Sequence, residues 1–176
     1  MVIYQQVSEY LEECFHFMES HLPSPDIVEI SEQKCLRYTE KLIETAIIQK
    51  LARYLSSLNA ARLLLDQGYT QEVGVMFRTL DEIGEDIRFL CIPKTGGDFT
   101  EIHRKYLEYF YQEEFDNPDN AFLSTQNRPT IPRKKIHAAI ANIGKKTLNP
   151  SDNQKNHRTI SQAYSSYVHG SSEHLI

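Results

Sequence analysis

The sequence predicts an all-α fold, a helical bundle of about six helices in a single domain over residues 1–176. Apolar residues recur every three or four positions along most of the chain, which is typical of α-helices with one buried side. All seven prolines lie between or at the edges of these periodic stretches. No segment alternates for long enough to predict a strand, and the nearest candidate, residues 26–30, is short. The helical pattern is still running at Ile176, which suggests a truncated C-terminus.

Three helices are expected in the first half of the chain. An apolar stripe over residues 3–22 predicts the first. Ser31 is placed to cap a long second helix, whose stripe starts at Leu36 and whose end is set by Gly68, since glycine tolerates left-handed backbone. Thr70 is expected to cap the third helix. The expected core positions of that helix are Val73, Phe77, Leu80, Gly84, Ile87 and Cys91.

Three more helices are expected in the second half. Asp98 and Glu101 resemble a capping box that opens an aromatic-rich fourth helix reaching Phe115. Residues 116–129 form a turn and a loop. Pro132 lies in the first turn of the fifth helix, and residues 151–167 predict the sixth.

Charge is unevenly distributed along the chain. Residues 1–120 carry 22 acidic and 11 basic side chains, whereas residues 121–176 carry 2 and 8. The basic segment could contact a phosphate backbone, or its helix could dock on the acidic third and fourth helices. Docking is favoured, because the segment lacks the interleaved aromatic side chains of single-strand binders. The candidate nucleic-acid-binding residues are Arg128, Arg133, Lys134, Lys135, Lys145 and Lys146.

We predict neither a metal nor a cofactor. The third helix has a cluster of carboxylates over residues 81–86, but a dinuclear bundle site needs two Glu-x-x-His pairs and two further glutamates. Residues 13–16 are the only Glu-x-x-His in the chain. A salt-bridged helix face explains the carboxylates better.

The composition indicates a cytoplasmic protein. The three cysteines are odd in number and far apart, which excludes a disulfide framework. The apolar runs are too short to span a membrane, and the N-terminus lacks the basic region of a signal peptide. We therefore expect no membrane association.

The C-terminal stretch is the most distinctive part of the sequence. His169 shares one helix side with several serines, and this surface of small polar side chains suggests the seam of a homodimer. The motif over residues 168–170, Val-His-Gly, resembles the histidine motif of the HEPN superfamily of all-α bundles, which includes toxin, phage-defence and RNA-processing proteins. Residues 77–82 are similar to a helix of an uncharacterised bacterial family that also carries a Ser-x-Tyr-Val-His-like segment.

The resemblance implies a HEPN-like bacterial protein, but the catalytic motif differs. HEPN ribonucleases have an arginine a short spacer before the histidine, and at that spacing this chain has Gln162, Ala163 and Tyr164. We therefore expect a non-catalytic binding or regulatory module, linked to toxin–antitoxin systems or phage defence, with a protein partner favoured over a nucleic acid. The alternative is a metal-independent ribonuclease with a rearranged site, for which His169 and Arg78 are the candidate catalytic residues.

Overall fold

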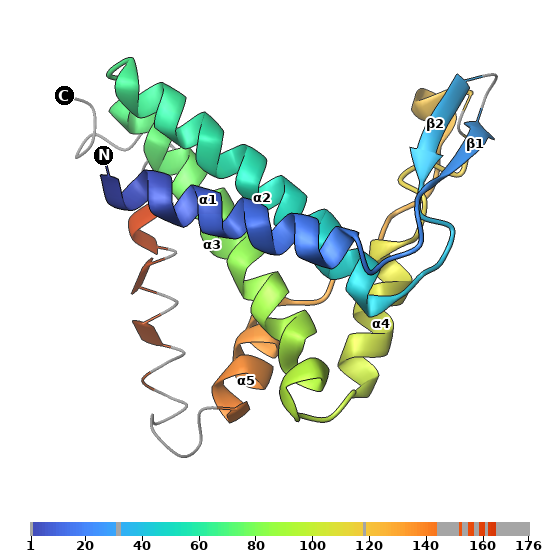
Figure 1. The fold of residues 1–176 in the computed structure, drawn as a ribbon. Helices are drawn as coiled ribbons and strands as arrows, with labels where there is room; N and C mark the ends of the chain where they lie inside the picture. Colours follow the sequence, from blue (N-terminus) through green and yellow to red (C-terminus); the bar gives the residue numbers. More distant parts are fainter. Residues whose placement is uncertain are drawn as a thin grey trace.

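The computed structural model describes residues 2–30, 33–117 and 119–143, together with residues 152, 155, 156, 159, 160 and 162–164. Helices account for 68% of the described residues, which confirms the predicted all-α bundle (Figure 1). In chain order, the elements are α1 (Val2–Glu19), β1 (Asp26–Ile30), β2 (Gln33–Arg37), α2 (Ile43–Asp66), α3 (Thr70–Cys91), η1 (Ile92–Thr95), α4 (Glu101–Phe110), η2 (Ala121–Leu123) and α5 (Arg133–Ile143).

The antiparallel pair α2–α3 forms the centre of the bundle (Figure 1). The two helices are joined by a tight turn in which Gly68 has φ +84°, the left-handed backbone expected from the sequence. Helix α1 packs on α2, α5 packs on α3, and α4 packs on α2. Each of these three outer helices is therefore positioned by contact with one of the two central helices.

The core lies where α2, α3, α4 and α5 meet. Phe89 and Leu90 of α3 are completely buried, and Ile136 of α5 is nearly so. Burial of each such side chain contributes about 1.5–3 kcal/mol relative to exposure. The core cluster consists of Ile43, Ala46, Ile47, Phe89, Leu90, Ile92, Tyr106, Ile136 and Ile140.

Helix α3 is buried on a wider surface than the sequence suggested. Val73 and Leu80 are buried as expected, but Phe77 is 43% exposed. The fully buried Phe89 and Leu90 are outside the predicted stripe. The reason is that α2 and α5 both pack against α3, so that its second half is covered on more than one side.

The prediction that the chain has no strand was wrong. Residues 26–30 and 33–37 form an antiparallel hairpin, and the second helix begins at Ile43 rather than after Ser31. Its stripe therefore excludes Leu36, which lies in β2 and is 68% exposed. The β-branched residues of β1 favour extended backbone. Leu36 is spaced from Ile43 like a residue on the same side of a helix, although it lies in a strand.

The fourth helix differs from its prediction at both ends. Thr100, not Asp98, precedes its first turn, and the Thr100 backbone N–H donates to His103 Nδ1 at 3.1 Å. The helix ends at Phe110 rather than at Phe115. Thr70 likewise begins α3 as its first residue instead of capping it, and Tyr69 takes the cap position.

The last two predicted helices differ in how much of them is described. Helix α5 begins at Arg133, so Pro132 lies directly before the helix rather than in its first turn. The described residues between Asp152 and Tyr164 are helical. None of the helices in the described ranges has the length and apolarity needed to cross a membrane.

Candidate functional site

Four helices contribute charged and polar side chains to one buried network, which we call the Asp86 network. Lys50 comes from α2, three carboxylates come from α3, Tyr106 comes from α4, and two basic side chains come from α5. Glu85 and Asp86 are 3% and 5% exposed, so these charges require partners. The members of the network are Lys50, Glu82, Glu85, Asp86, Tyr106, Arg133 and His137.

Asp86 is the centre of this network. Its Oδ2 accepts from Lys50 Nζ at 2.8 Å, and its Oδ1 accepts from Arg133 Nη1. The Tyr106 ring of α4 lies beside the same carboxylate. Asp86 therefore ties α2 and α5 to α3 through one side chain.

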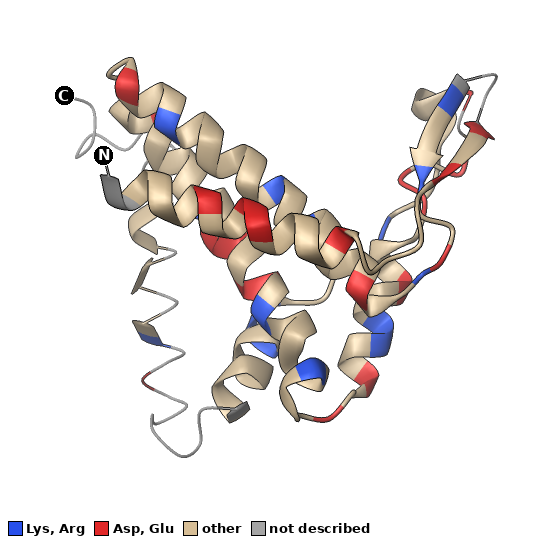
Figure 2. Cartoon of the chain, viewed as in Figure 1, with Lys and Arg blue, Asp and Glu red and all other residues tan. Residues whose placement is uncertain are grey.

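Glu85 extends the network along α5 to His137. His137 Nε2 lies 2.8 Å from Glu85 Oε2, and Arg133 Nη1 lies 3.7 Å from the same oxygen. Arg133 also donates to the backbone carbonyl of Glu82 at 3.1 Å. Figure 2 shows acidic positions of α3 where it approaches basic positions of α5. This part of the basic segment thus docks on the acidic third helix.

Arg128 binds the end of α4. Its Nε and Nη2 donate to the carbonyls of Tyr109 and Phe110 at 2.9 and 2.8 Å, and its Nη1 lies 3.2 Å from Glu114. The last carbonyls of a helix lack intrahelical partners and carry partial negative charge. The Arg128 guanidinium therefore stabilises the end of α4 at Phe110.

A cleft of about 570 Å³ opens beside the Asp86 network. Three cations border it: Lys50, Arg128 and Arg133. Lys50 Nζ lies 5.5 Å from the centre of the Phe110 ring, a cation–π contact that fixes the ammonium at the wall. Two carboxylates also border it, Asp86 and Glu114, and both are paired with these cations. The remaining walls are largely aromatic and apolar, with Tyr106, Tyr109, Pro129, Ile131 and Ile136 among them.

The cleft offers hydrogen-bond donors more readily than acceptors. Asp86 already accepts from two cationic side chains, whereas the Lys50 ammonium donates one described bond and has three protons. The Thr130 hydroxyl also borders the cleft. An anionic group is therefore the chemistry that this surface can recognise.

Proton transfer is poorly supported at this site. Burial, with Asp86 adjacent, raises the pKa of Tyr106 far above its usual value. Burial also raises the pKa of the Cys91 thiol in the neighbouring core. A general acid or base works best with a pKa near the operating pH, and both shifts move away from neutrality.

The structure places the sequence candidates differently. Arg128 and Arg133 border the cleft, whereas Lys134 and Lys135 are exposed on α5. Arg78 lies on α3 with its Nε 3.3 Å from Glu82 Oε1. His169, Lys145 and Lys146 lie outside the described residues.

Sequence reasoning missed Lys50, Tyr106 and His137. The available signal for Lys50 was its position beside the apolar stripe of α2, where a charge needs a buried partner. Tyr106 was interpreted only as part of an aromatic stripe. Among the described residues, no group of three His, Cys, Asp or Glu side chains is arranged to hold a metal ion.

Comparisons with protein-family models, curated proteins and solved structures find no match for this chain.

Proposed function

We propose that this chain is a non-catalytic binding or regulatory module that takes a small anionic ligand with an apolar or aromatic body. The observation that carries the proposal is the convergence of Lys50, Arg128 and Arg133, from three separate segments, on one cleft of about 570 Å³. Tyr109 and Phe110 supply ring surface beside these cations. A ligand carrying a carboxylate or phosphate on an aromatic ring matches both features.

The cleft is preorganised for such a ligand. Each of the three cations is already held by internal partners, so little side-chain entropy remains to be lost on binding. Asp86 holds both Lys50 and Arg133, which couples ligand binding to the packing of α2 against α5. A regulatory role follows naturally, because occupancy would stabilise the arrangement of these helices.

The cellular setting rests on the resemblance alone. The similarity of residues 77–82 and 168–170 to HEPN-like proteins supports a bacterial, cytoplasmic module acting as a homodimer in a toxin–antitoxin or phage-defence system. A protein partner agrees better than a nucleic acid with the intramolecular pairing of Arg128 and Arg133.

Phenyl phosphate is the probe that tests ligand binding. We expect it to bind in isothermal titration calorimetry and to raise the melting temperature, with inorganic phosphate binding more weakly. Lys50→Gln and Thr130→Val should each weaken binding by about tenfold or more, about 1.4 kcal/mol or more in free energy. The matched control Lys105→Gln removes an exposed cation of α4 and should leave binding unchanged. Absence of binding, or equal binding by the cleft variants and the control, would refute the proposal.

A ribonuclease with a rearranged site is the second candidate. The observation in its favour is that Arg78 and Arg133 both approach Glu82, at 3.3 and 3.9 Å. These cations therefore lie on one side of α3, where a phosphate could meet them. We expect no hydrolysis of single-stranded RNA without metal. Cleavage that is lost in His169→Ala would make this candidate the better one.

A further inference from the structure

We propose that the outer face of the β1–β2 hairpin is the seam of a two-fold dimer of this chain. The hairpin projects from the bundle, and a two-stranded hairpin by itself is marginally stable in water (Figure 1). Its inner face carries the half-buried Val28 and Cys35. Arg37, on that same face, pairs with Glu113 beyond α4. This inner face is turned toward the rest of the molecule, which leaves the outer face to be explained.

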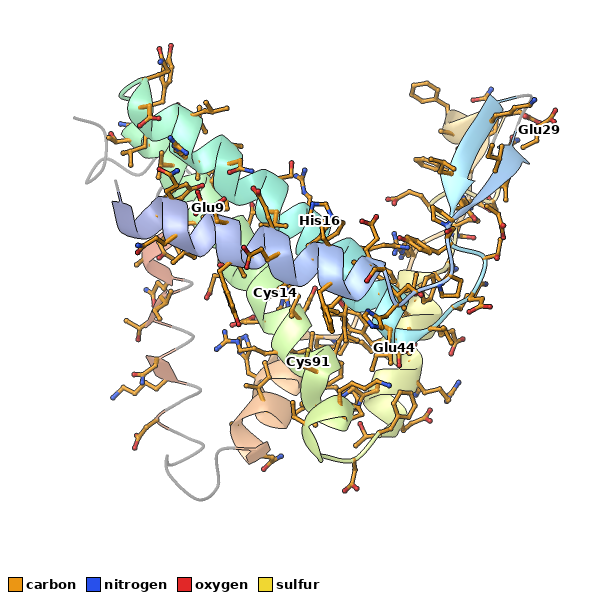
Figure 3. The ribbon with its side chains drawn as sticks, viewed as in Figure 1. Glu9, Cys14, His16, Glu29, Glu44 and Cys91 are labelled. Atoms are coloured by element: carbon orange, nitrogen blue, oxygen red, sulfur yellow. The ribbon has the colours of Figure 1, made fainter. Side chains whose placement is uncertain are left out.

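The outer face combines an apolar pair with a charged pair. Ile27 lies opposite Leu36, and their side chains are 71% and 68% exposed. Glu29 lies opposite Lys34 on the same face, and both are exposed. Figure 3 shows Glu29 far out on the hairpin, away from the bundle. Neither charge takes part in an ion pair within the described part of the chain.

This arrangement is complementary to itself. Consider a second hairpin stacked on the first at about 10 Å, the usual spacing of packed sheets, and related by a two-fold axis parallel to the strands. The rotation places β1 of one copy over β2 of the other. Ile27 then faces Leu36 of the second copy, and Glu29 faces Lys34 of the second copy, twice in each dimer. An isologous interface needs this reciprocity.

A second copy is therefore the occupant that the face fits. A lone apolar pair would accept many partners, but the register puts an acid opposite a base only for an identical hairpin in this orientation. The face is small compared with standard interfaces, so the dimer should be weak, with a dissociation constant on the order of 10⁻⁵ to 10⁻⁴ M. The seam does not include the cleft, so the test of dimerisation is independent of the test of ligand binding.

Charge reversal tests the seam directly. Sedimentation velocity of the full chain should show a dimer that dissociates on dilution. Glu29→Lys places two lysines opposite each other at both contacts, and Lys34→Glu places two glutamates there. Each variant should weaken dimerisation by about tenfold or more. Glu108→Lys, on the exposed surface of α4, is the matched control and should dimerise like the wild type.

Mixing the two variants separates an intermolecular contact from an effect within one hairpin. A mixed dimer pairs one Glu29→Lys chain with one Lys34→Glu chain.

The Glu29→Lys chain carries lysine at both positions, and the Lys34→Glu chain carries glutamate at both. Because position 29 of one chain always meets position 34 of the other, each contact of the mixed dimer pairs a lysine with a glutamate, so both contacts are attractive. The double variant Glu29→Lys with Lys34→Glu also has an acid opposite a base at both contacts, because each chain then carries the exchanged pair.

We therefore expect the equimolar mixture to regain wild-type dimerisation, and the double variant to dimerise like the wild type. Far-ultraviolet circular dichroism verifies that each variant is folded. A monomer at all concentrations, a dimer insensitive to both reversals, or a mixture that stays dissociated would each overturn the proposal.

Discussion

His103 illustrates how one buried side chain can make stability depend on pH. The residue is 1% exposed, and its ring stacks on Phe89 with the ring centres 4.1 Å apart. Nε2 donates to the Phe89 carbonyl at 3.1 Å, and Nδ1 accepts from the Thr100 N–H. The imidazole is therefore neutral in the folded protein, and burial lowers the pKa of His103.

Stability should fall when the pH drops below about 6.5, the pKa of an unfolded histidine. Below this pH the unfolded chain takes up a proton at His103, whereas the buried ring in the folded protein does not. The stabilising contribution of neutral His103 is therefore complete above about pH 6.5 and is lost as the pH falls toward the lowered pKa of the folded state. The limiting slope for one proton is about 1.4 kcal/mol per pH unit. Urea unfolding of the wild type and His103→Gln between about pH 5 and pH 7.5 should show this slope only in the wild type. Identical profiles would contradict a neutral buried His103.

Asp86 should be the residue whose charge matters most to the fold. Asp86→Asn keeps the size of the side chain but leaves Lys50 and Arg133 without their carboxylate. We expect the free energy of unfolding to fall by about 3 kcal/mol. This is the lower end of the range for breaking a buried ion pair, because Lys50 and Arg133 both border the cleft. Glu108→Gln, which removes an exposed partner of Arg104, should cost less than about 0.5 kcal/mol. Equal losses in urea unfolding would show that the Asp86 network is not the stabilising feature.

At the scale of elements, α5 is held on α3 by specific members of the basic segment. Arg133 contacts three carboxylates of α3, at Glu82, Glu85 and Asp86. The neighbouring Lys134 and Lys135 are exposed in the same turn. These two lysines are therefore matched controls for Arg133.

Arg133→Glu should cost more than about 3 kcal/mol, because it adds a fourth carboxylate to a buried acidic site. Lys134→Glu combined with Lys135→Glu should change the free energy of unfolding by less than about 0.5 kcal/mol. Thermal unfolding of both variants measures the difference. If the lysine variant instead loses single-stranded RNA binding that falls steeply with salt, those two residues serve a nucleic acid rather than the fold.

At the scale of the whole molecule, the protection of backbone amides from hydrogen exchange should decrease from the central pair α2–α3 outward. Helices α2 and α3 bury most of the core, whereas the hairpin and the segment over residues 111–130 have few buried apolar contacts. Native-state hydrogen exchange should thus be slowest in α2 and α3 and fastest in those two regions. Exchange in the hairpin should slow as protein concentration rises, because dimerisation covers its outer face. Uniform protection along the chain would contradict this gradient.

The sequence predicted elements well where a local signal acts alone. Gly68 ends α2 because left-handed backbone favours glycine, and Pro132 precedes α5 because proline fits the start of a helix. Local patterns failed where a residue of a strand also has the spacing of a helix. Leu36 has the right spacing for the α2 stripe, yet it pairs with Ile27 across the hairpin. The pairing is non-local, and a helical pattern alone cannot exclude it.

By itself, the sequence determined that the chain is an all-α bundle, since apolar periodicity and chain breaks depend only on neighbouring residues. It also indicated that acidic and basic parts would meet. Only the tertiary structure decided which charges meet: Arg133 reaches Asp86 across 47 positions, and Lys50 reaches it across 36. The cleft, the network and the end of α4 at Phe110 all depend on such contacts. Their partners are set by the packing of four helices, which no local pattern encodes.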